Sequence, residues 1–241
     1  MRAPRKRATS RRVRFAALLV VLVLSLGVAA AIAASTTITR SHALAVANAI
    51  NLRHADLPSL TQQSNPITKQ ETASNAQLTK CTGGEPNSDA LALAQSPDFV
   101  TGGTASATLS SEVEIAPTVA SAKKDLASIV GSRGLPCLQN QLTAELRAGA
   151  SKGETLSVHG AIIPSGLSGS DGSFAVRLTI TVHVTKGKTV VSEPIYGDEI
   201  GFLYGQAEVS LNDVEINGQP SLSLLHRLAA VLLSRARTAV G

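Results

Sequence analysis

The sequence predicts an α+β fold in which an antiparallel sheet carries helices on one face, preceded by one N-terminal transmembrane or signal helix. Three observations support this prediction. Residues 15–34 form an apolar run, residues 174–184 alternate between apolar and polar side chains, and apolar residues recur at helical spacing over 119–130 and 222–236. The order of one helix, one strand, two helices, several strands and a final helix is typical of this architecture.

The N-terminal segment accounts for the basic character of the chain. Residues 1–14 hold seven Arg and Lys side chains, and residues 1–34 contain no acid. The run at 15–34 has about the 20 residues that a helix needs to cross a bilayer. Because cations that flank an apolar helix stay in the cytoplasm, we expect a cytoplasmic segment at 1–14 and an extracytoplasmic domain after the run.

Two fates of residues 15–34 remain open. The length of the run favours an uncleaved anchor, since the apolar part of a signal peptide usually has about 7 to 15 residues. The small residues Ala31 and Ala33 instead match the pattern that signal peptidase reads. The protein is therefore expected to be a single-pass membrane protein that contacts the lipid bilayer through residues 15–34, or to be secreted after cleavage.

Composition argues against nucleic acid as a partner. Beyond residue 34 the chain has 15 basic and 17 acidic side chains. The basic residues form no stripe that could neutralise a phosphate backbone. Aromatic side chains, on which single-stranded nucleic acid stacks, are scarce.

The first part of the exported region is predicted to be helical and then polar. Residues 35–55 form a helical lead-in with Ser41 as its N-cap, ahead of a domain over 56–241. Most of 59–90 is expected to be surface loop, with a short helix from Lys69 to Thr79.

A half-buried strand is predicted from Thr104 to Ile115, because its side chains alternate. The packed side is expected to hold Leu109, Val113 and Ile115, and the polar side Ser110, Glu112 and Glu114. Helical spacing then predicts a helix over 119–130 that ends at Gly131, and a second helix whose first turn contains Pro136.

The rest of the chain is predicted to be strands followed by a helix. Residues 174–184 give the clearest strand signal, with one face packed and one wet. A turn at 186–188 leads into a partner strand from Thr189 that Pro194 interrupts. A further strand around 207–211, a turn at Asn217 and an amphipathic helix complete the chain. The apolar stripe of that helix comprises Leu222, Leu225, Ala229, Leu232, Leu233 and Ala236.

Cys81 and Cys137 are the two cysteines of the chain. Disulfides form and persist in exported compartments, and no third thiol competes, so we expect the two to be paired. Neither lies in a C-x-x-C motif or beside a histidine, which argues against a metal site.

The sequence contains only incomplete matches to catalytic and metal-binding motifs. Ser168 follows Gly166 as in a nucleophile elbow, but Ser170 stands where that motif needs glycine. The five histidines lack short metal-ligand spacing, although His159 and His183 could meet on strand surfaces. Glu112 with Glu114, and Asp198 with Glu199, are acidic pairs, which catalyse acid–base chemistry only when their environments separate their pKa values. No catalytic, cofactor-binding or metal-binding residue is assigned.

Several short stretches resemble a known family. These are Ala55-Asp56-Leu57-Pro58, Cys81, Ser96-Pro97-Asp98-Phe99, Glu114-Ile115 followed by PTVASAKKDL, Cys137 after GSRGLP, and the closing GQAEVSLNDVEINGQPSLSLLHRLAAVLLSRAR. They resemble the actinobacterial exported domains typified by the LpqN-type lipoproteins and by the extracellular sensor domain of the PknH-type receptor kinase. The resemblance implies a PsbP-like α/β sandwich and a role in the cell envelope. The chain departs from the family because it has no lipidation cysteine and no kinase domain, and has one cysteine pair where the kinase sensor has more.

Together these observations favour a non-enzymatic binding or sensor-like module of the cell envelope, with an envelope protein or an apolar ligand as its partner and no cofactor. The alternative is an exported hydrolase with dispersed acid and base residues. A cleft that joins His159 or His183 to a carboxylate would favour the hydrolase.

Overall fold

The computed structural model describes residues 38–84, 89–101, 106–151, 153–186 and 189–240. The basic segment 1–14 and the apolar run 15–34 lie outside these residues. Within the described part, no helix combines the length and the apolar character that a membrane crossing requires.

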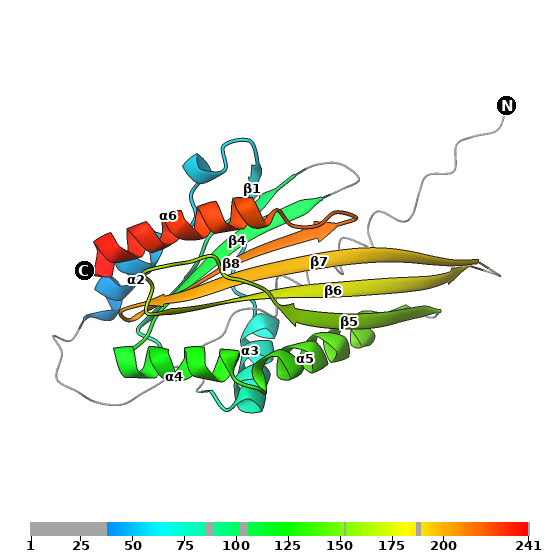
Figure 1. The fold of residues 1–241 in the computed structure, drawn as a ribbon, viewed down its shortest axis with the longest axis horizontal. Coiled ribbons are helices and arrows are strands. Elements are labelled where there is room, and N and C mark those ends of the chain that lie inside the picture. Colours follow the sequence, from blue (N-terminus) through cyan, green and yellow to red (C-terminus); the bar gives the residue numbers. More distant parts are fainter. Residues whose placement is uncertain (1–37, 85–88, 102–105, 152, 187–188, 241) are drawn as a thin grey trace.

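The described strands form one antiparallel sheet, and its eight members are β1 (Thr61–Gln63), β2 (Ala92–Gln95), β3 (Asp98–Val100), β4 (Ala107–Ile115), β5 (Glu154–Ile162), β6 (Gly172–Lys186), β7 (Thr189–Tyr204) and β8 (Ala207–Ile216). Their order is β1-β3-β4-β8-β7-β6-β5, and β2 also pairs with β4. The long strands β6, β7 and β8 are consecutive in the sequence and pair with one another in that order, so the centre of the sheet is a meander (Figure 1).

Helices cover both faces of the sheet, which corrects the expectation of one face. They are α2 (Arg40–Ile50), a 3₁₀ helix (His54–Asp56), α3 (Lys69–Thr82), α4 (Val119–Val130), α5 (Gly134–Gly149) and α6 (Leu222–Val240). Helices α2 and α6 pack on one side, here called the α6 face, and α3, α4 and α5 lie on the other, here called the α4 face (Figure 1). Both faces are covered because the central strands carry apolar side chains on both, for example Ile200 on the α6 face and Ile195 on the α4 face.

The core of the α6 face is the larger of the two main clusters. The apolar stripe of α6 is buried as predicted, apart from Leu222, which is half-buried. Helix α2 contributes Ala43, Ala47 and Ile50, so the helical lead-in is part of the same core. Arg235 of α6 fastens this region, because it donates to the carbonyl of Asn51 at 2.9 Å and to both carboxylate oxygens of Asp56.

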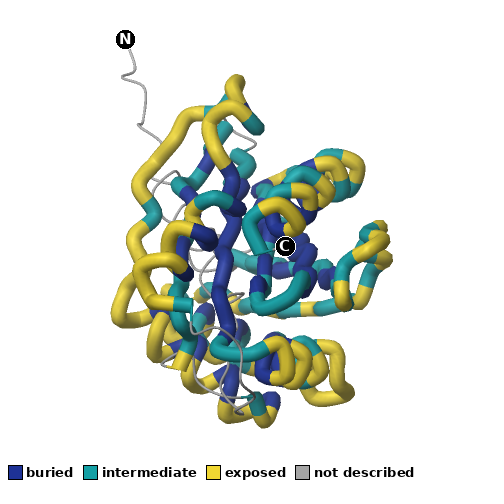
Figure 2. Tube along the Cα trace, turned by 90° about the vertical axis from the view of Figure 1, so that its left-hand side faces the viewer, coloured by how far each residue is buried: buried dark blue, intermediate teal, exposed yellow. Residues whose placement is uncertain are grey.

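The second core lies between α5 and strands β5 to β7. Leu138, Leu142 and Leu146 of α5 pack on Leu178 and Ile180 of β6, which confirms the packed side predicted for 174–184. The sheet is accordingly a buried layer between exposed helix surfaces (Figure 2).

Two strand predictions were wrong in part. Strand β4 is buried on both sides from Leu109 onward, whereas its polar side was expected to face water. Strand β7 runs unbroken through Pro194, which pairs with Thr181 of β6. Pairing of β7 with β8 begins only at Ile195. Proline has no backbone N–H, and at Pro194 this removes no hydrogen bond between strands because β8 is not yet paired there.

The helix boundaries agree with the predictions to within a few residues. Helix α2 is capped by Thr39, whose side chain accepts from the N–H of His42, rather than by Ser41. Helix α3 continues to Thr82, and α5 begins at Gly134, with Pro136 in its first turn.

Cys81 and Cys137 form a disulfide, with their Cα atoms 5.8 Å apart. The bond joins the end of α3 to the first turn of α5. Arg133 supports the junction, since its guanidinium donates to the carbonyl of Cys81 at 2.6 and 3.2 Å. The pairing expected from the exported compartment is therefore present.

Candidate functional site

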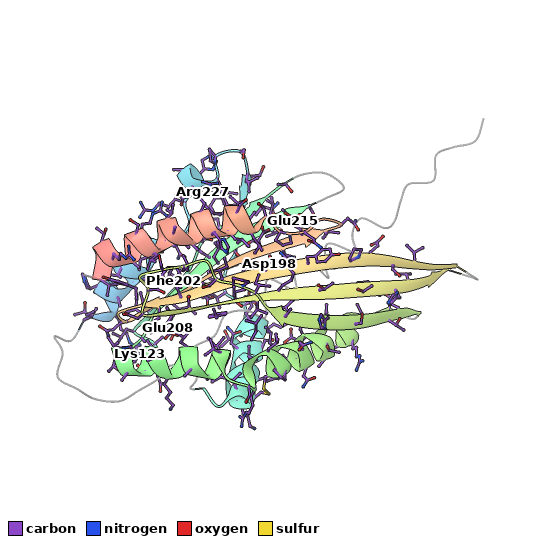
Figure 3. The ribbon with its side chains drawn as sticks, viewed as in Figure 1. Lys123, Asp198, Phe202, Glu208, Glu215 and Arg227 are labelled. Atoms are coloured by element: carbon purple, nitrogen blue, oxygen red, sulfur yellow. A yellow bond between two sulfur atoms is a disulfide. The ribbon has the colours of Figure 1, made fainter. Side chains whose placement is uncertain are left out.

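A small pocket with a cavity volume of about 30 Å³, partly open to solvent, lies on the α4 face between α4 and the sheet. Strand residues from β4, β6, β7 and β8 and two side chains of α4 surround it. The lining comprises Glu112, Glu114, Leu126, Ile129, Phe174, Glu199, Phe202, Leu203, Glu208, Val209 and Ser210. Figure 3 shows Glu208 on the sheet beside α4, which also carries Lys123.

Strand register brings the four glutamates to the same face. On β4, Glu112 and Glu114 are two residues apart and so point to the same side. Glu114 pairs with Glu208 of β8, and Glu112 pairs with Ser210 of the same strand. Glu199 of β7 pairs with Asn212, two residues beyond Ser210 along β8, and therefore shares this face.

Small residues leave space in the middle of this array. Ser210 lies opposite Gly201 of β7, which has no side chain. The ring of Phe174 rests over Gly201, where an added Cβ would collide with it. The floor of the pocket is therefore lower at Ser210 than at the surrounding glutamates, and the ring of Phe174 fills the space above Gly201.

Helix α4 forms the roof of the pocket through Leu126 and Ile129. The helix begins with a capping box in which Thr118 and Ser121 satisfy each other's backbone N–H groups. Leu126 approaches the sheet closely because it packs against Gly172, where a Cβ would strike its side chain.

Burial raises the pKa values of the carboxyls in and beside the pocket. Glu199 is 2% exposed, and its burial, reinforced by the charge of Glu112, raises its pKa well above the usual value. Burial and the charge of Asp125 raise the pKa of Glu208 to about 9. Burial raises the pKa of Asp125 to about 8, although Lys124 acts in the opposite direction.

Hydrogen bonding in the pocket is incomplete. Glu112 accepts a 2.7 Å hydrogen bond from the side-chain amide of Gln95. Among the described residues, none hydrogen-bonds to Oε1 of Glu199, to Oε1 of Glu208 or to either carboxylate oxygen of Asp125. Buried polar atoms have hydrogen-bond partners in most native proteins. A bound ligand could supply the hydrogen bonds that these oxygens lack.

The structure brings together part of what the sequence suggested. Glu112, Glu114 and Glu199 meet in one pocket although they come from two different acidic pairs. Asp198 points to the α6 face instead, where Arg177 donates to its two carboxylate oxygens at 2.7 and 2.5 Å. Adjacent residues of a strand point to opposite faces, which separates Asp198 from Glu199.

The histidines and the serine are not part of this pocket. His159 is opposite Thr179 and His183 is opposite Thr155, so the two are four positions apart along the paired strands and do not meet. His183 contacts Ser192 at 2.7 Å. Ser168 lies in the connection between β5 and β6, where its carbonyl accepts from Arg237.

Sequence reasoning missed Glu208, Asp125 and Ser210. The signal that could have found Glu208 is the alternation of β8, in which it follows the buried Ala207 and precedes the buried Val209. Asp125 lies between Ala122 and Leu126 on the buried side of α4, where a carboxylate is rare.

A second group of buried acids lies on the α6 face. Asp198 is paired directly with Asp213 across β7 and β8, and Glu215 is two residues further along β8. Burial, followed by the charges of Glu215 and Asp198, raises the pKa of Asp213 to about 7. Arg177 forms an ion pair with Asp198 and so balances its charge. We therefore interpret these acids as a structural part of the sheet.

Comparisons with known proteins give one distant likeness. No protein-family model matches the chain, and no curated protein matches it. Among solved structures, it is similar to the extracellular domain of PknH from Mycobacterium tuberculosis, with 10% sequence identity and a TM-score of 0.39, over 85% of this chain and 100% of that chain.

Proposed function

We propose that the protein is an extracytoplasmic binding or sensor-like module of the cell envelope and that the pocket under α4 is its ligand site. Residues 15–34 would hold it in the membrane, or it would be secreted after their removal. The seven cations ahead of the apolar run and the disulfide between Cys81 and Cys137 support this location.

Glu199 is the observation that carries the assignment of the site. Its side chain is almost fully buried, borders the pocket and has a carboxylate oxygen without a hydrogen-bond partner among the described residues. Leaving such a group unsatisfied costs about 1 to 3 kcal/mol, and more when it is charged. A ligand that satisfies it would recover this free energy on binding.

Binding fits the pocket better than hydrolysis does. Acid–base catalysis by two carboxyls needs environments that push their pKa values apart. Here burial shifts the pKa values of Glu199 and Glu208 in the same direction, upward. Neither His159 nor His183 borders the pocket, so the cleft that would favour a hydrolase is not formed by these residues.

A pocket-filling variant tests the proposal. Ser210→Leu would place a larger side chain in the pocket, which Ser210 lines, whereas Ser157→Leu makes the same change at an exposed position of β5. We expect a low-molecular-weight filtrate of the producing cells to raise the melting temperature of the wild type and of Ser157→Leu. A ligand at about 100 times its Kd adds about 2.7 kcal/mol of stability, or about 5 °C or more for a chain of this size.

Ser210→Leu should lose this stabilisation while still folding cooperatively. A filtrate that stabilises none of the three proteins, or one that stabilises all three equally, would overturn the assignment of the ligand site.

A further inference from the structure

The described residues that line the pocket are acidic, polar or apolar, and none of them is basic. Four glutamates border it, and Lys123 and Lys124 of α4 are exposed to solvent rather than part of the lining. An anionic ligand would add a negative charge beside these glutamates, where none of the described lining residues is a cation that could receive it. The charge of the site therefore selects a ligand that is positive or neutral.

The Glu199 side chain favours a positively charged ligand over a neutral one. Its Oε1 atom is buried, borders the pocket and has no hydrogen-bond partner among the described residues. Oε1 of Glu208, on the neighbouring strand, is in the same condition. Once it has released its proton, each carboxyl accepts hydrogen bonds without donating any, so a ligand with several N–H donors and a positive charge complements the ionised form of these two groups.

Apart from Ser210, the remaining walls are apolar. Leu126 and Ile129 come from α4, and Leu203 and Phe174 come from the sheet. A short hydrocarbon stem can pack against these side chains while a charged head reaches the glutamates. The pocket is narrow, because Leu126 approaches Gly172 and Phe174 covers Gly201, so the ligand must be compact.

A metal ion fits this site less well. Among the described residues, no three His, Cys, Asp or Glu side chains are placed to hold one. Hard divalent cations such as Ca²⁺ take about six to eight oxygen ligands, which an arrangement with apolar walls cannot supply.

We propose that the pocket binds a compact primary alkylammonium compound, whose head group donates hydrogen bonds to Glu199 and Glu208 and whose stem packs on Leu126 and Ile129. This inference rests on the proposed function, because it names the ligand class of the same site. No covalent bond forms or breaks. Each carboxyl that becomes ionised around the ammonium group releases its proton to solvent.

Proton release follows from the groups that face Glu199. Glu112 and Glu114 of β4 and Glu208 of β8 line the pocket with Glu199, and Asp125 of α4, whose pKa burial raises and Lys124 lowers, acts on Glu208. Burial raises the pKa of Glu208 to about 9, so this carboxyl holds a proton at neutral pH when the pocket is empty, and burial raises the pKa of Glu199 as well. Affinity for the ammonium should then rise with pH, up to tenfold per pH unit for each proton released, until the pH reaches the raised pKa of the carboxyl, about 9 for Glu208.

Isothermal titration calorimetry with propylammonium chloride tests the inference. We expect saturable binding to the wild type, with a heat that differs between two buffers of different ionisation enthalpy because protons are released. Propanol and propionate, the neutral and anionic analogues, should bind at least about tenfold more weakly.

Two variants connect the binding to the pocket. Glu199→Gln, which keeps the shape of the protonated side chain, should weaken propylammonium binding at least about tenfold and reduce the number of protons released. Glu193→Gln, on the same strand but outside the pocket, should bind as the wild type does. If Glu199→Gln did not fold, Ser210→Leu would serve in its place.

Equal affinity of wild type and Glu199→Gln, an identical heat in both buffers, or tighter binding of Ca²⁺ or of propanol would overturn the inference. Tighter binding of a blocked lysine peptide than of propylammonium would overturn its assignment to a small amine. The proposed function fails separately, because a filtrate that stabilises the wild type and not Ser210→Leu would support the pocket even if propylammonium did not bind.

Discussion

The free energy of unfolding should fall as the pH rises from about 5 to about 8, by about 1.4 kcal/mol per pH unit for each buried carboxyl that keeps its proton in the folded protein. Glu208 has a pKa of about 9 in the folded protein against 4.5 as its ordinary value, and the pKa of Glu199 is raised as well. A carboxyl with a raised pKa binds its proton more tightly in the folded state. Its contribution to stability is complete below the ordinary pKa and is lost as the pH approaches the raised one.

Other carboxyls either add to this trend or leave it unchanged. Burial raises the pKa of Asp125 to about 8 and that of Asp213 to about 7, so both act in the same direction. Asp56 behaves differently. Burial alone would raise its pKa, but the hydrogen bonds from Arg235 and from the N–H of Arg53 lower it. The contribution of Asp56 is lost only as the pH falls below about 4, so it stays constant over the range considered.

Urea unfolding at three pH values measures the effect. Glu208→Gln, which is neutral at every pH, should give a shallower slope than the wild type by about 1.4 kcal/mol per pH unit. Glu193→Gln, a change of the same chemistry outside the pocket, should keep the wild-type slope. A wild-type stability that stays level or increases between about pH 5 and about pH 8 would show that the pocket carboxyls are ionised in the folded protein.

Replacing Cys81 and Cys137 together by Ser should lower the free energy of unfolding by about 4 kcal/mol while leaving the fold intact. The two cysteines are 56 residues apart in the sequence, and a bond between them restricts a long stretch of the unfolded chain. In the folded protein, α3 and α5 are also held by side chains, because Ser74 donates to Glu145 at 2.6 Å. We therefore expect the double variant to keep this contact and to lose stability mainly through its freer unfolded state.

Comparison of oxidised wild type, reduced wild type and the double variant in urea measures this difference. The reduced protein and the double variant should unfold at similar urea concentrations, both below that of the oxidised protein. Thiol labelling of protein taken from the envelope without reductant should find no free cysteine. Complete labelling would contradict both the pairing in the native protein and the oxidising compartment.

Much of the secondary structure could be predicted because its signals are local. The alternation at 174–184 predicts β6, and the spacing of Leu225, Ala229 and Leu232 predicts the buried side of α6. Such periodicity shows which side chains share a face. It does not show what covers that face, so the glutamates of β4 were expected to face water, whereas α4 lies over them.

The candidate site could be predicted only in part for the same reason. Glu112, Glu114 and Glu199 stand out as members of acidic pairs, but their meeting depends on the order β4-β8-β7, which no short motif specifies. Glu208 and Asp125 have no sequence neighbour that marks them. Their importance comes from burial, which raises their pKa values and which depends on the tertiary structure.

Site-specific NMR titration of the Glu199 carboxyl carbon, assigned by comparison with Glu199→Gln, tests most directly whether the pocket is built to receive a positive charge. In the protein without ligand, we expect the pKa of Glu199 to lie well above the usual range for glutamate, and to fall when propylammonium is added. A pKa near about 4.3, the value for an unperturbed glutamate, that does not change with propylammonium would contradict a pocket that exchanges a proton for a bound cation.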